Sequence, residues 1–194
     1  MITLSTKEEL REHILDIRNR YDESKLSSMS QAINNKLNHL SEFKEALNVS
    51  TYVSKSKEVG TIDFIMKALR NGKNVLIPIV EKGKKDLRFS QLLGMEELEE
   101  GSFGVLEPKE NFRRFISGSE VDIAIIPGVV WSIEGHRIGY GKGYYDRYLS
   151  SLDKNIPTVG LSYDFQLKSK VPVRKHDIGV QIIVTESKII RCTN

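Results

Sequence analysis

The feature that most constrains this chain is a set of short apolar runs that alternate with segments of helical periodicity. Asn74–Val80 and Val121–Ile126 are nearly unbroken apolar stretches, and Thr158–Leu161 and Ile182–Val184 are shorter ones. Strands that are buried on both faces have this pattern, because both sets of side chains along the strand face a core. We therefore expect these segments to lie inside a mostly parallel sheet.

Helical patterns fill the N-terminal quarter of the chain. Thr6 and Glu9 have the spacing of a capping box, and the apolar residues that follow at helical intervals predict a helix over Lys7–Tyr21. The pattern repeats over Met29–Leu40, and Phe43–Leu47 indicates a short further turn. We expect a helical N-terminal segment.

Strand and helix signals alternate in the next part of the chain. Val49–Val53 favours a strand, and Ile62–Leu69 predicts a helix closed by Asn71-Gly72. Leu87–Phe89 is a short candidate strand within an irregular stretch from Glu81 to Glu120. Strands separated by helices are typical of α/β proteins. The predicted fold class is a single-domain layered α/β fold with a mostly parallel central sheet flanked by helices.

Composition limits the classes of protein to which the chain belongs. Of its 194 residues, 39% are hydrophobic and 28% are charged, and no Pro/Gly/Ser-rich linker divides them, so we expect one domain over residues 1–194. Lys and Arg number 29 against 26 Asp and Glu, and a net charge of +3 does not indicate nucleic-acid binding. The apolar runs are far shorter than the roughly 20 residues of a membrane-spanning helix. We expect neither a nucleic-acid nor a membrane partner.

Cysteine usage indicates the compartment. The only cysteine, Cys192, can form neither an internal disulfide nor a cysteine-based zinc site, and we interpret it as a small residue near a frayed end. The first residues lack the apolar region of a secretory signal. We expect a cytoplasmic protein.

The most informative segment, residues 135–149, passes from a glycine-dense loop into an amphipathic helix. Glycines alternate with other residues over Gly139–Gly143. Backbone N–H groups of such a loop approach an anion closely, and the N-terminus of the following helix adds partial positive charge. Arg137 and Lys142 are suited to neutralise phosphate oxygens. The spacing matches neither the Walker A motif nor the dinucleotide fingerprint, so the alternative is a tight surface turn.

Asp146 follows in the first turn of this expected helix. A carboxylate repels a triphosphate unless a divalent cation lies between them, and Mg²⁺ uses few carboxylates together with phosphate oxygens. The alternative is an ordinary first-turn helix acid. Tyr140, Tyr144, Tyr145 and Tyr148 suit stacking on a planar ligand, but we expect at least two of them to pack the helix against the sheet.

The glycine segment is one of five blocks that together form a recognisable pattern. They are Lys7-x-x-Leu10-Arg11, Tyr52-Val53-Ser54 with Glu58-Val59 and Thr61, Gly101-x-Phe103-Gly104 with Glu107-Pro108, Pro127-Gly128 leading to Gly139–Leu149, and Gly160–Gln166 with Val171-Pro172-Val173 and His176-Asp177. With these blocks the chain resembles the 5-formyltetrahydrofolate cyclo-ligase family. The blocks span nearly the whole chain in the family's order.

The resemblance implies an ATP- and Mg²⁺-dependent conversion of 5-formyltetrahydrofolate to 5,10-methenyltetrahydrofolate, ADP and phosphate. It also implies two overlapping sets of binding residues. The residues expected to bind ATP are Lys7, Arg11, Arg137, Gly139, Gly141, Lys142, Gly143, Tyr144 and Tyr145. The residues expected to bind the folate are Val53, Glu58, Tyr140, Gly141, Lys142, Gly143 and Tyr144.

The resemblance assigns catalysis to Lys142 and Arg137, and it assigns Mg²⁺ binding to Asp146 and Asp177. Asp177 rests on the resemblance alone, because its distance from Asp146 in the sequence carries no periodicity. For Glu58 the chemistry agrees with the resemblance, since a carboxylate suits the donor-rich edge of a pterin.

Other functions stay open at this point. One is an ATP-independent isomerase or acyl-transfer enzyme on a related α/β scaffold, and another is a non-catalytic nucleotide- or folate-binding module. Arg113 and Arg114 form a basic pair that suits the γ-carboxylates of a polyglutamated folate, although an ordinary solvated pair is the simpler interpretation. We expect a monomer.

Overall fold

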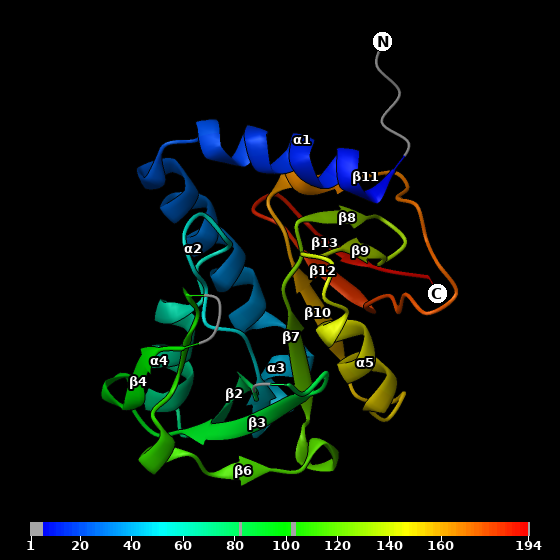
Figure 1. The fold of residues 1–194 in the computed structure, drawn as a ribbon. Helices are drawn as coiled ribbons and strands as arrows, with labels where there is room; N and C mark the ends of the chain where they lie inside the picture. The colour runs from blue at the N-terminus through cyan, green and yellow to red at the C-terminus, as the bar shows by residue number, and fades with distance from the viewer. Residues whose placement is uncertain (1–5, 82, 102–103, 194) are drawn as a thin grey trace.

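The computed structural model describes residues 6–81, 83–101 and 104–193 (Figure 1). Phe103 of the third block lies outside these residues. The helices are α1 (Lys7–Arg20), α2 (Glu23–His39), α3 (Ser41–Glu45), α4 (Ile62–Arg70) and α5 (Tyr144–Ser151). The strands are β1 (Asn48–Ser50), β2 (Asn74–Val80), β3 (Leu87–Leu92), β4 (Leu98–Glu100), β5 (Leu106–Pro108), β6 (Phe115–Ile116), β7 (Ile123–Ile126), β8 (Val130–Ser132), β9 (Arg137–Ile138), β10 (Thr158–Leu161), β11 (Leu167–Lys168), β12 (Ile182–Val184) and β13 (Ile189–Arg191).

The central sheet of the described residues has eight strands in the order β13-β12-β10-β7-β1-β2-β3-β6. The five strands from β12 to β2 pair in parallel, and antiparallel strands extend both edges. The predicted mostly parallel sheet flanked by helices is therefore confirmed.

Two apolar layers cover the two faces of this sheet. Along β7, Ile123 and Ile125 belong to the core that α2, α3 and α4 complete, whereas Ala124 and Ile126 belong to the core that α5 completes. Successive side chains of a strand point to opposite faces, so a strand between two layers is apolar throughout. All four residues of β7 are buried, which explains the unbroken apolar run in the sequence.

The chain leaves two neighbouring strands in opposite directions. From β1 it passes through α4 on one face to β2, and from β7 it passes through α5 on the other face to β10. The connections therefore diverge beyond the carboxyl ends of β1 and β7. In open α/β sheets, ligands bind in the crevice that such a divergence leaves.

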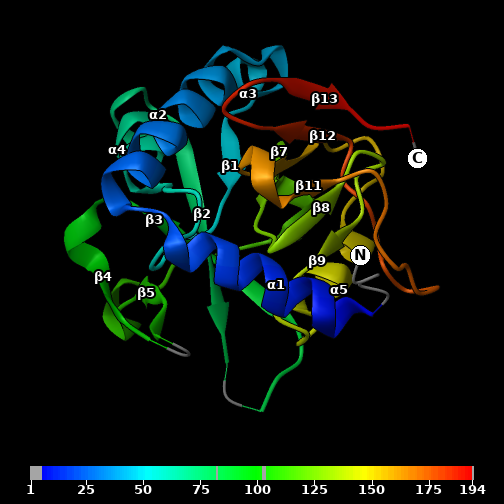
Figure 2. The same cartoon turned by 90° about the horizontal axis from the view of Figure 1, so that it is seen from above.

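A small second sheet, β11-β8-β9, lies beneath α1, as Figures 1 and 2 show. Leu10 and Ile14 of α1 pack on Val129, Val130 and Ile138. The helix begins with the predicted capping box, in which the Thr6 side chain accepts from the Glu9 N–H and Glu9 reciprocates. This packing sets α1 across the edge of the crevice.

The sequence expectations differ from the structure mainly at strand ends. β1 ends at Ser50 and not at Val53, although Thr51, Tyr52 and Val53 are buried and the N–H of Thr51 still donates to the Leu76 carbonyl of β2 at 3.0 Å. β3 is longer than expected and pairs antiparallel with β2. Residues 81–86 join these two strands, and a parallel crossover needs a dozen or more residues. The edge strands β6 and β13 carry no buried apolar run and were not expected.

The sequence indicates a frayed end at Cys192, but the fold holds this residue in place. Its N–H donates to the Gln181 carbonyl at 2.8 Å, and its side chain packs against the apolar layer on the α5 face. Burial raises the pKa of the thiol to about 11. In the part of the chain that the structure describes, none of the helices combines the length and the apolar character needed to cross a membrane.

Two glycines make room for the buried Trp131. A Cβ at Gly160 of β10 would lie 2.4 Å from Cη2 of Trp131, and one at Gly128 would lie 2.5 Å from its Cε2. We expect Gly160→Ala to lower the free energy of unfolding by about 1–3 kcal/mol, because overpacking forces neighbours to move. Urea denaturation followed by the fluorescence of Trp131, the only tryptophan, measures the change.

Gly118→Ala is the matched control. A Cβ at Gly118 meets nothing within 4 Å among the described residues, and the backbone there is not left-handed. Equal unfolding midpoints for the two alanine variants would contradict the role of Gly160.

Candidate active site

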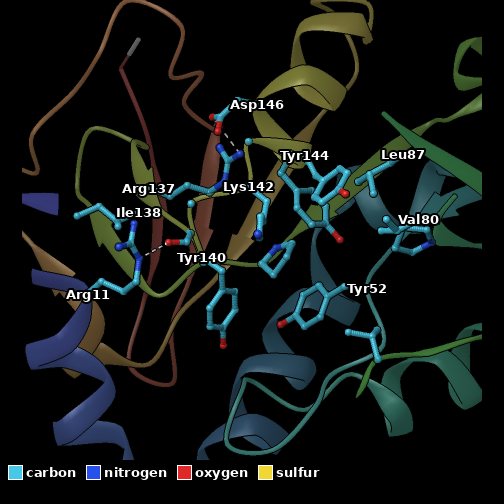
Figure 3. A pocket seen from close by; sticks show the side chains of 18 of the residues that line it. Arg11, Tyr52, Val80, Leu87, Arg137, Ile138, Tyr140, Lys142, Tyr144 and Asp146 are labelled. Atoms are coloured by element: carbon cyan, nitrogen blue, oxygen red, sulfur yellow. Dashed lines mark hydrogen bonds and ion pairs between the residues drawn. The ribbon is translucent and has the colours of Figure 1, made fainter. Parts of the chain in front are cut away.

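A cavity of about 470 Å³ opens at the crevice predicted by the topology (Figure 3). Tyr52 and Val53 after β1, Val80 at the end of β2, and Pro127 and Gly128 after β7 all line it. The remaining wall comes from α1, residues 55–58, the start of β3, the region of β5, the glycine loop, the start of α5 and the segment before β12. The carboxyl ends of three parallel strands therefore form its floor.

The glycine loop between β9 and α5 forms one wall. Gly141 and Gly143 have φ values of 89° and 69°, in the left-handed region that favours glycine. Gly143 is the N-cap residue of α5, and no side chain of the described residues caps this helix end. The N–H groups of the first turn and the positive end of the helix dipole thus adjoin the cavity. This is a suitable arrangement for binding an anion.

Arg137 of β9 is buried and tied to two other segments. Its Nη2 donates to Oδ1 of Asp146 at 3.1 Å, and its Nη1 donates to the Ile178 carbonyl at 2.8 Å. Asp146 Oδ1 also accepts from the N–H of Ile178 at 3.4 Å. Burial lowers the pKa of the Arg137 guanidinium, and the charge of Asp146 opposes that shift. Arg137 remains a cation, because the guanidinium of arginine keeps its proton throughout the physiological pH range.

Asp177 brings a second carboxylate to the same cavity. It forms an ion pair with Lys7 of α1 and accepts from the N–H of Arg174 at 2.5 Å. Burial acts to raise the pKa of Asp177, but the hydrogen bonds from Lys7 and Arg174 outweigh it, so that the pKa lies below its ordinary value. The fold thus brings Asp146 and Asp177 to one cavity, although their spacing in the sequence did not indicate a shared site.

These carboxylates fit a magnesium ion only in part. The described residues hold no group of three or more His, Cys, Asp or Glu side chains that would bind a metal by themselves. Mg²⁺ is bound in many enzymes by one or two carboxylates together with substrate phosphates and water. Asp146 and Asp177 suit that mode and do not form a complete metal cage.

Arg11 and Lys142 complete the cationic side of the cavity. Arg11 Nε donates to the Gly139 carbonyl at 2.7 Å and so fastens α1 to the glycine loop. In Figure 3 the side chain of Lys142 extends into the cavity between Tyr140 and Tyr144. Tyr144 Oη donates to the Lys84 carbonyl at 3.5 Å.

Glu58 and Tyr140 form the other end of the cavity lining. Tyr140 Oη donates to Glu58 Oε1 at 3.0 Å, and the N–H of Lys55 donates to Glu58 Oε2 at 3.1 Å. Burial and the nearby charge of Glu58 raise the pKa of Tyr140, so its hydroxyl is neutral. The two side chains place a negatively charged acceptor beside a hydroxyl.

Every site residue expected from the sequence lines this one cavity. The tyrosines divide as expected, because Tyr145 and Tyr148 pack in the layer under α5, while Tyr140 is half exposed. Arg113 and Arg114 do not line the cavity. Arg114 instead forms a two-pronged ion pair with Glu97 at 2.9 Å for each bond, and this pairing favours a structural role.

Several lining residues were not assigned a role from the sequence. Glu8, Lys55, Arg174 and the buried Glu107 are the charged ones. Glu8, Lys55 and Glu107 lie in or beside the recognised blocks, and Arg174 lies between two parts of the last block. Their position in those blocks was a signal, but nothing in the local pattern distinguished them from surface charges.

Comparisons of the sequence and the fold with known proteins identify the family. The sequence model of the 5-formyltetrahydrofolate cyclo-ligase family matches residues 3–186. The probable 5-formyltetrahydrofolate cyclo-ligase of Caenorhabditis elegans is 29% identical over 95% of this chain and 94% of its own length. The 5-formyltetrahydrofolate cyclo-ligase of Escherichia coli K12 is 33% identical over 74% of this chain and 80% of its own length.

Two solved structures share the fold. The NMR structure of the 5,10-methenyltetrahydrofolate synthetase of Aquifex aeolicus superposes with a TM-score of 0.85 at 30% identity, covering 97% of this chain and 93% of that one. The 5,10-methenyltetrahydrofolate synthetase of Mycoplasma pneumoniae gives 0.76 at 25% identity, covering 93% and 98%. This chain belongs to the 5-formyltetrahydrofolate cyclo-ligase family.

Proposed function

We propose that this chain uses ATP and Mg²⁺ to convert 5-formyltetrahydrofolate to 5,10-methenyltetrahydrofolate, with release of ADP and phosphate. Its family membership supports the cyclo-ligase reaction. The observation that carries the residue assignments is that one cavity holds both a cationic glycine loop and the Glu58–Tyr140 pair. A phosphate donor and a donor-rich heterocycle can therefore meet without leaving the protein.

The reaction explains why a phosphoryl donor is needed. A formamide carbonyl is a poor electrophile, because nitrogen donates electron density into it, and its oxygen is a poor leaving group. Transfer of the γ-phosphoryl group to that oxygen gives an imidate-like phosphate. N10 of the same folate then attacks the carbon and loses its proton, and phosphate leaves with the former formyl oxygen. The protein has mainly to position the two reactants and neutralise charge.

In this proposal the basic residues bind the triphosphate. Lys142 extends into the cavity and follows the γ-phosphoryl group as its charge shifts to the formyl oxygen. Arg137 supplies a buried positive charge beneath the loop, and its planar fork holds a fixed direction. Lys7 and Arg11 reach the same wall from α1. The N–H groups at the start of α5 add donors that need no reorganisation.

Glu58 and Tyr140 are proposed to recognise the pterin. The amino group and ring N–H of a pterin edge are paired donors, and a carboxylate with two oxygens accepts from both. Val53 adds apolar contact at the floor. A pterin bound by these contacts has its formyl group towards Gly141 and Lys142, where the phosphoryl group is transferred.

Asp146 and Asp177 are proposed to hold Mg²⁺ together with phosphate oxygens. When bound, the ion neutralises part of the triphosphate charge and competes with Arg137 and Lys7 for the two carboxylates. The proposal also includes a single cyclo-ligase domain over residues 1–194, a monomer, and a cytoplasmic location in keeping with the single cysteine. It includes no nucleic-acid or membrane partner.

A single assay tests the proposed reaction. We expect purified protein with Mg·ATP and 5-formyltetrahydrofolate to produce a near-ultraviolet absorption that rises with time, as the conjugated methenyl product forms. ADP is expected to appear only when the folate is present. A product that forms without ATP would indicate an isomerase or acyl-transfer enzyme, and binding without turnover would indicate a non-catalytic module.

Lys142→Ala tests the phosphate loop. We expect kcat to fall by about 10²–10³-fold, the cost of removing one group that stabilises transition-state charge, while the KM for the folate changes much less. Steady-state kinetics with each substrate varied in turn measure both. Lys154→Ala, an exposed lysine beyond the end of α5, is the control, and a similar loss in this variant would refute a specific role.

Asp146→Asn tests the metal role. The amide keeps an oxygen that accepts from Arg137 but removes the negative charge. We expect the Mg²⁺ concentration for half-maximal rate to rise by about tenfold or more, the scale on which even supporting groups of metal sites act. Asp153→Asn, on an exposed aspartate after α5, should leave the Mg²⁺ dependence unchanged. Identical Mg²⁺ titrations for the two variants would remove Asp146 from the metal site.

A further inference from the structure

Arg18 of α1 is a buried cation that belongs neither to the proposed ATP-binding residues nor to the proposed folate-binding residues. Its exposed fraction is 6%. Its Nη2 donates to Tyr140 Oη at 3.1 Å, whereas no group of the described chain accepts from its Nε or Nη1. Burying a guanidinium with most of its donors unpaired is unfavourable, since the charge loses its hydration. Packing alone does not explain a charged residue at this position.

The Tyr140 hydroxyl connects the Arg18 guanidinium to the Glu58 carboxylate, at the end of the cavity proposed to bind the folate. Tyr140 accepts from Arg18 and donates to Glu58 Oε1 at 3.0 Å, so that cation, hydroxyl and carboxylate form a directed chain. Hydrogen bonds in series polarise one another. Because Arg18 carries only donors, the Tyr140 hydroxyl must accept from it and is left to donate to Glu58. Arg18 therefore sets the direction of the Tyr140–Glu58 hydrogen bond.

Glu58 itself is held from its other sides. Its second oxygen accepts from the N–H of Lys55 at 3.1 Å, and its backbone carbonyl accepts from Tyr163 Oη at 2.9 Å. Tyr140, by contrast, is 50% exposed, and its ring is not enclosed by the core. Lys55 Nζ lies 5.7 Å from the ring centroid, and the hydroxyl is held between Arg18 and Glu58. The hydrogen bond from Arg18 is thus the contact that ties the Tyr140 hydroxyl to α1.

The position of Arg18 follows the helical repeat of α1. At 3.6 residues per turn, Arg11 lies about 40° and Arg18 about 20° around the helix from Lys7. All three cations therefore share one face, and each contacts a different point of the cavity wall. Lys7 pairs with Asp177, Arg11 binds the Gly139 carbonyl, and Arg18 binds Tyr140.

We propose that Arg18 is a positioning residue for folate recognition, which holds the Tyr140 hydroxyl and the Glu58 carboxylate in the orientation that meets the donor edge of the pterin. The inference rests on the proposed contact of Glu58 and Tyr140 with the folate. Arg18 acts through Tyr140 and touches no reacting atom. Its charge also compensates the Glu58 carboxylate when the pterin displaces water from it.

Arg18→Met tests the inference, because it removes the charge and keeps an unbranched side chain. Loss of a hydrogen bond to a charged group predicts an increase of about 10–100-fold in the KM for 5-formyltetrahydrofolate and in its calorimetric Kd without ATP. The KM for ATP and the kcat should change less than about threefold. Arg20→Met is the matched control, since Arg20 lies on the exposed face of the same helix and pairs with Asp16.

A double-mutant cycle separates positioning from general destabilisation. In a Tyr140→Phe background, Arg18→Met should cause no further increase in the folate Kd, because the hydroxyl through which it acts is gone. An equal increase in both backgrounds, or an equal increase in the KM for ATP, would overturn the inference. If Arg18→Met does not fold, Arg18→Lys replaces it in the same cycle, with a smaller increase that must again vanish beside Tyr140→Phe.

Glu58→Gln distinguishes this inference from the proposal on which it rests. An unchanged folate Kd in Glu58→Gln would contradict the pterin contact itself, and the inference about Arg18 would fail with it. If Glu58→Gln weakens folate binding and Arg18→Met does not, only the inference about Arg18 is wrong.

Discussion

The buried guanidinium of Arg137 holds the site together, because its acceptors lie on segments that are far apart in the sequence. Its own strand β9 precedes the glycine loop, Asp146 lies in the first turn of α5, and Ile178 follows Asp177. A buried arginine has rigidly placed donors, so its acceptors must take defined positions around it. The glycine loop is thereby fixed at both ends, and the segment that carries Asp177 is drawn to the same cavity.

The α1 helix adds a second set of supports that depends on this arrangement. Lys7, Arg11 and Arg18 of this helix contact the Asp177 carboxylate, the Gly139 carbonyl and the Tyr140 hydroxyl, all of which lie on or beside segments that Arg137 positions. The apolar face of α1 packs on β8 and β9 at the same time. The net charge of +3 therefore says little about the site, because Lys7 and Arg137 pair with Asp177 and Asp146, and Arg18 is linked to Glu58 through Tyr140.

The local pattern of the sequence predicted the elements that repeat regularly. The α1 capping box, the helix α4, and the apolar strands β2, β10 and β12 lie where hydrophobic periodicity places them. The pairing of β2 with β3 was not predicted, because the direction of a neighbour depends on the length of the connection and not on the apolar run itself. The pairing of Asp177 with Lys7 joins positions at opposite ends of the chain. No local period reports such a contact, and Asp177 was reached through the resemblance of whole blocks.

Arg18 illustrates a different limit. Its spacing from Lys7 and Arg11 is visible in the sequence, yet a basic residue on a polar helix is ordinarily a solvated one, and only the burial in the fold distinguishes it from Arg20. The glycine loop depends on this buried contact. Tyr140 and Lys142 flank Gly141, whose backbone is left-handed, and one side chain meets Glu58 while the other extends into the cavity. A loop that is proposed to contact both ATP and the folate needs a separate anchor for each of these contacts. Arg11 fastens the loop at Gly139, and Arg18 fastens the side chain next to it.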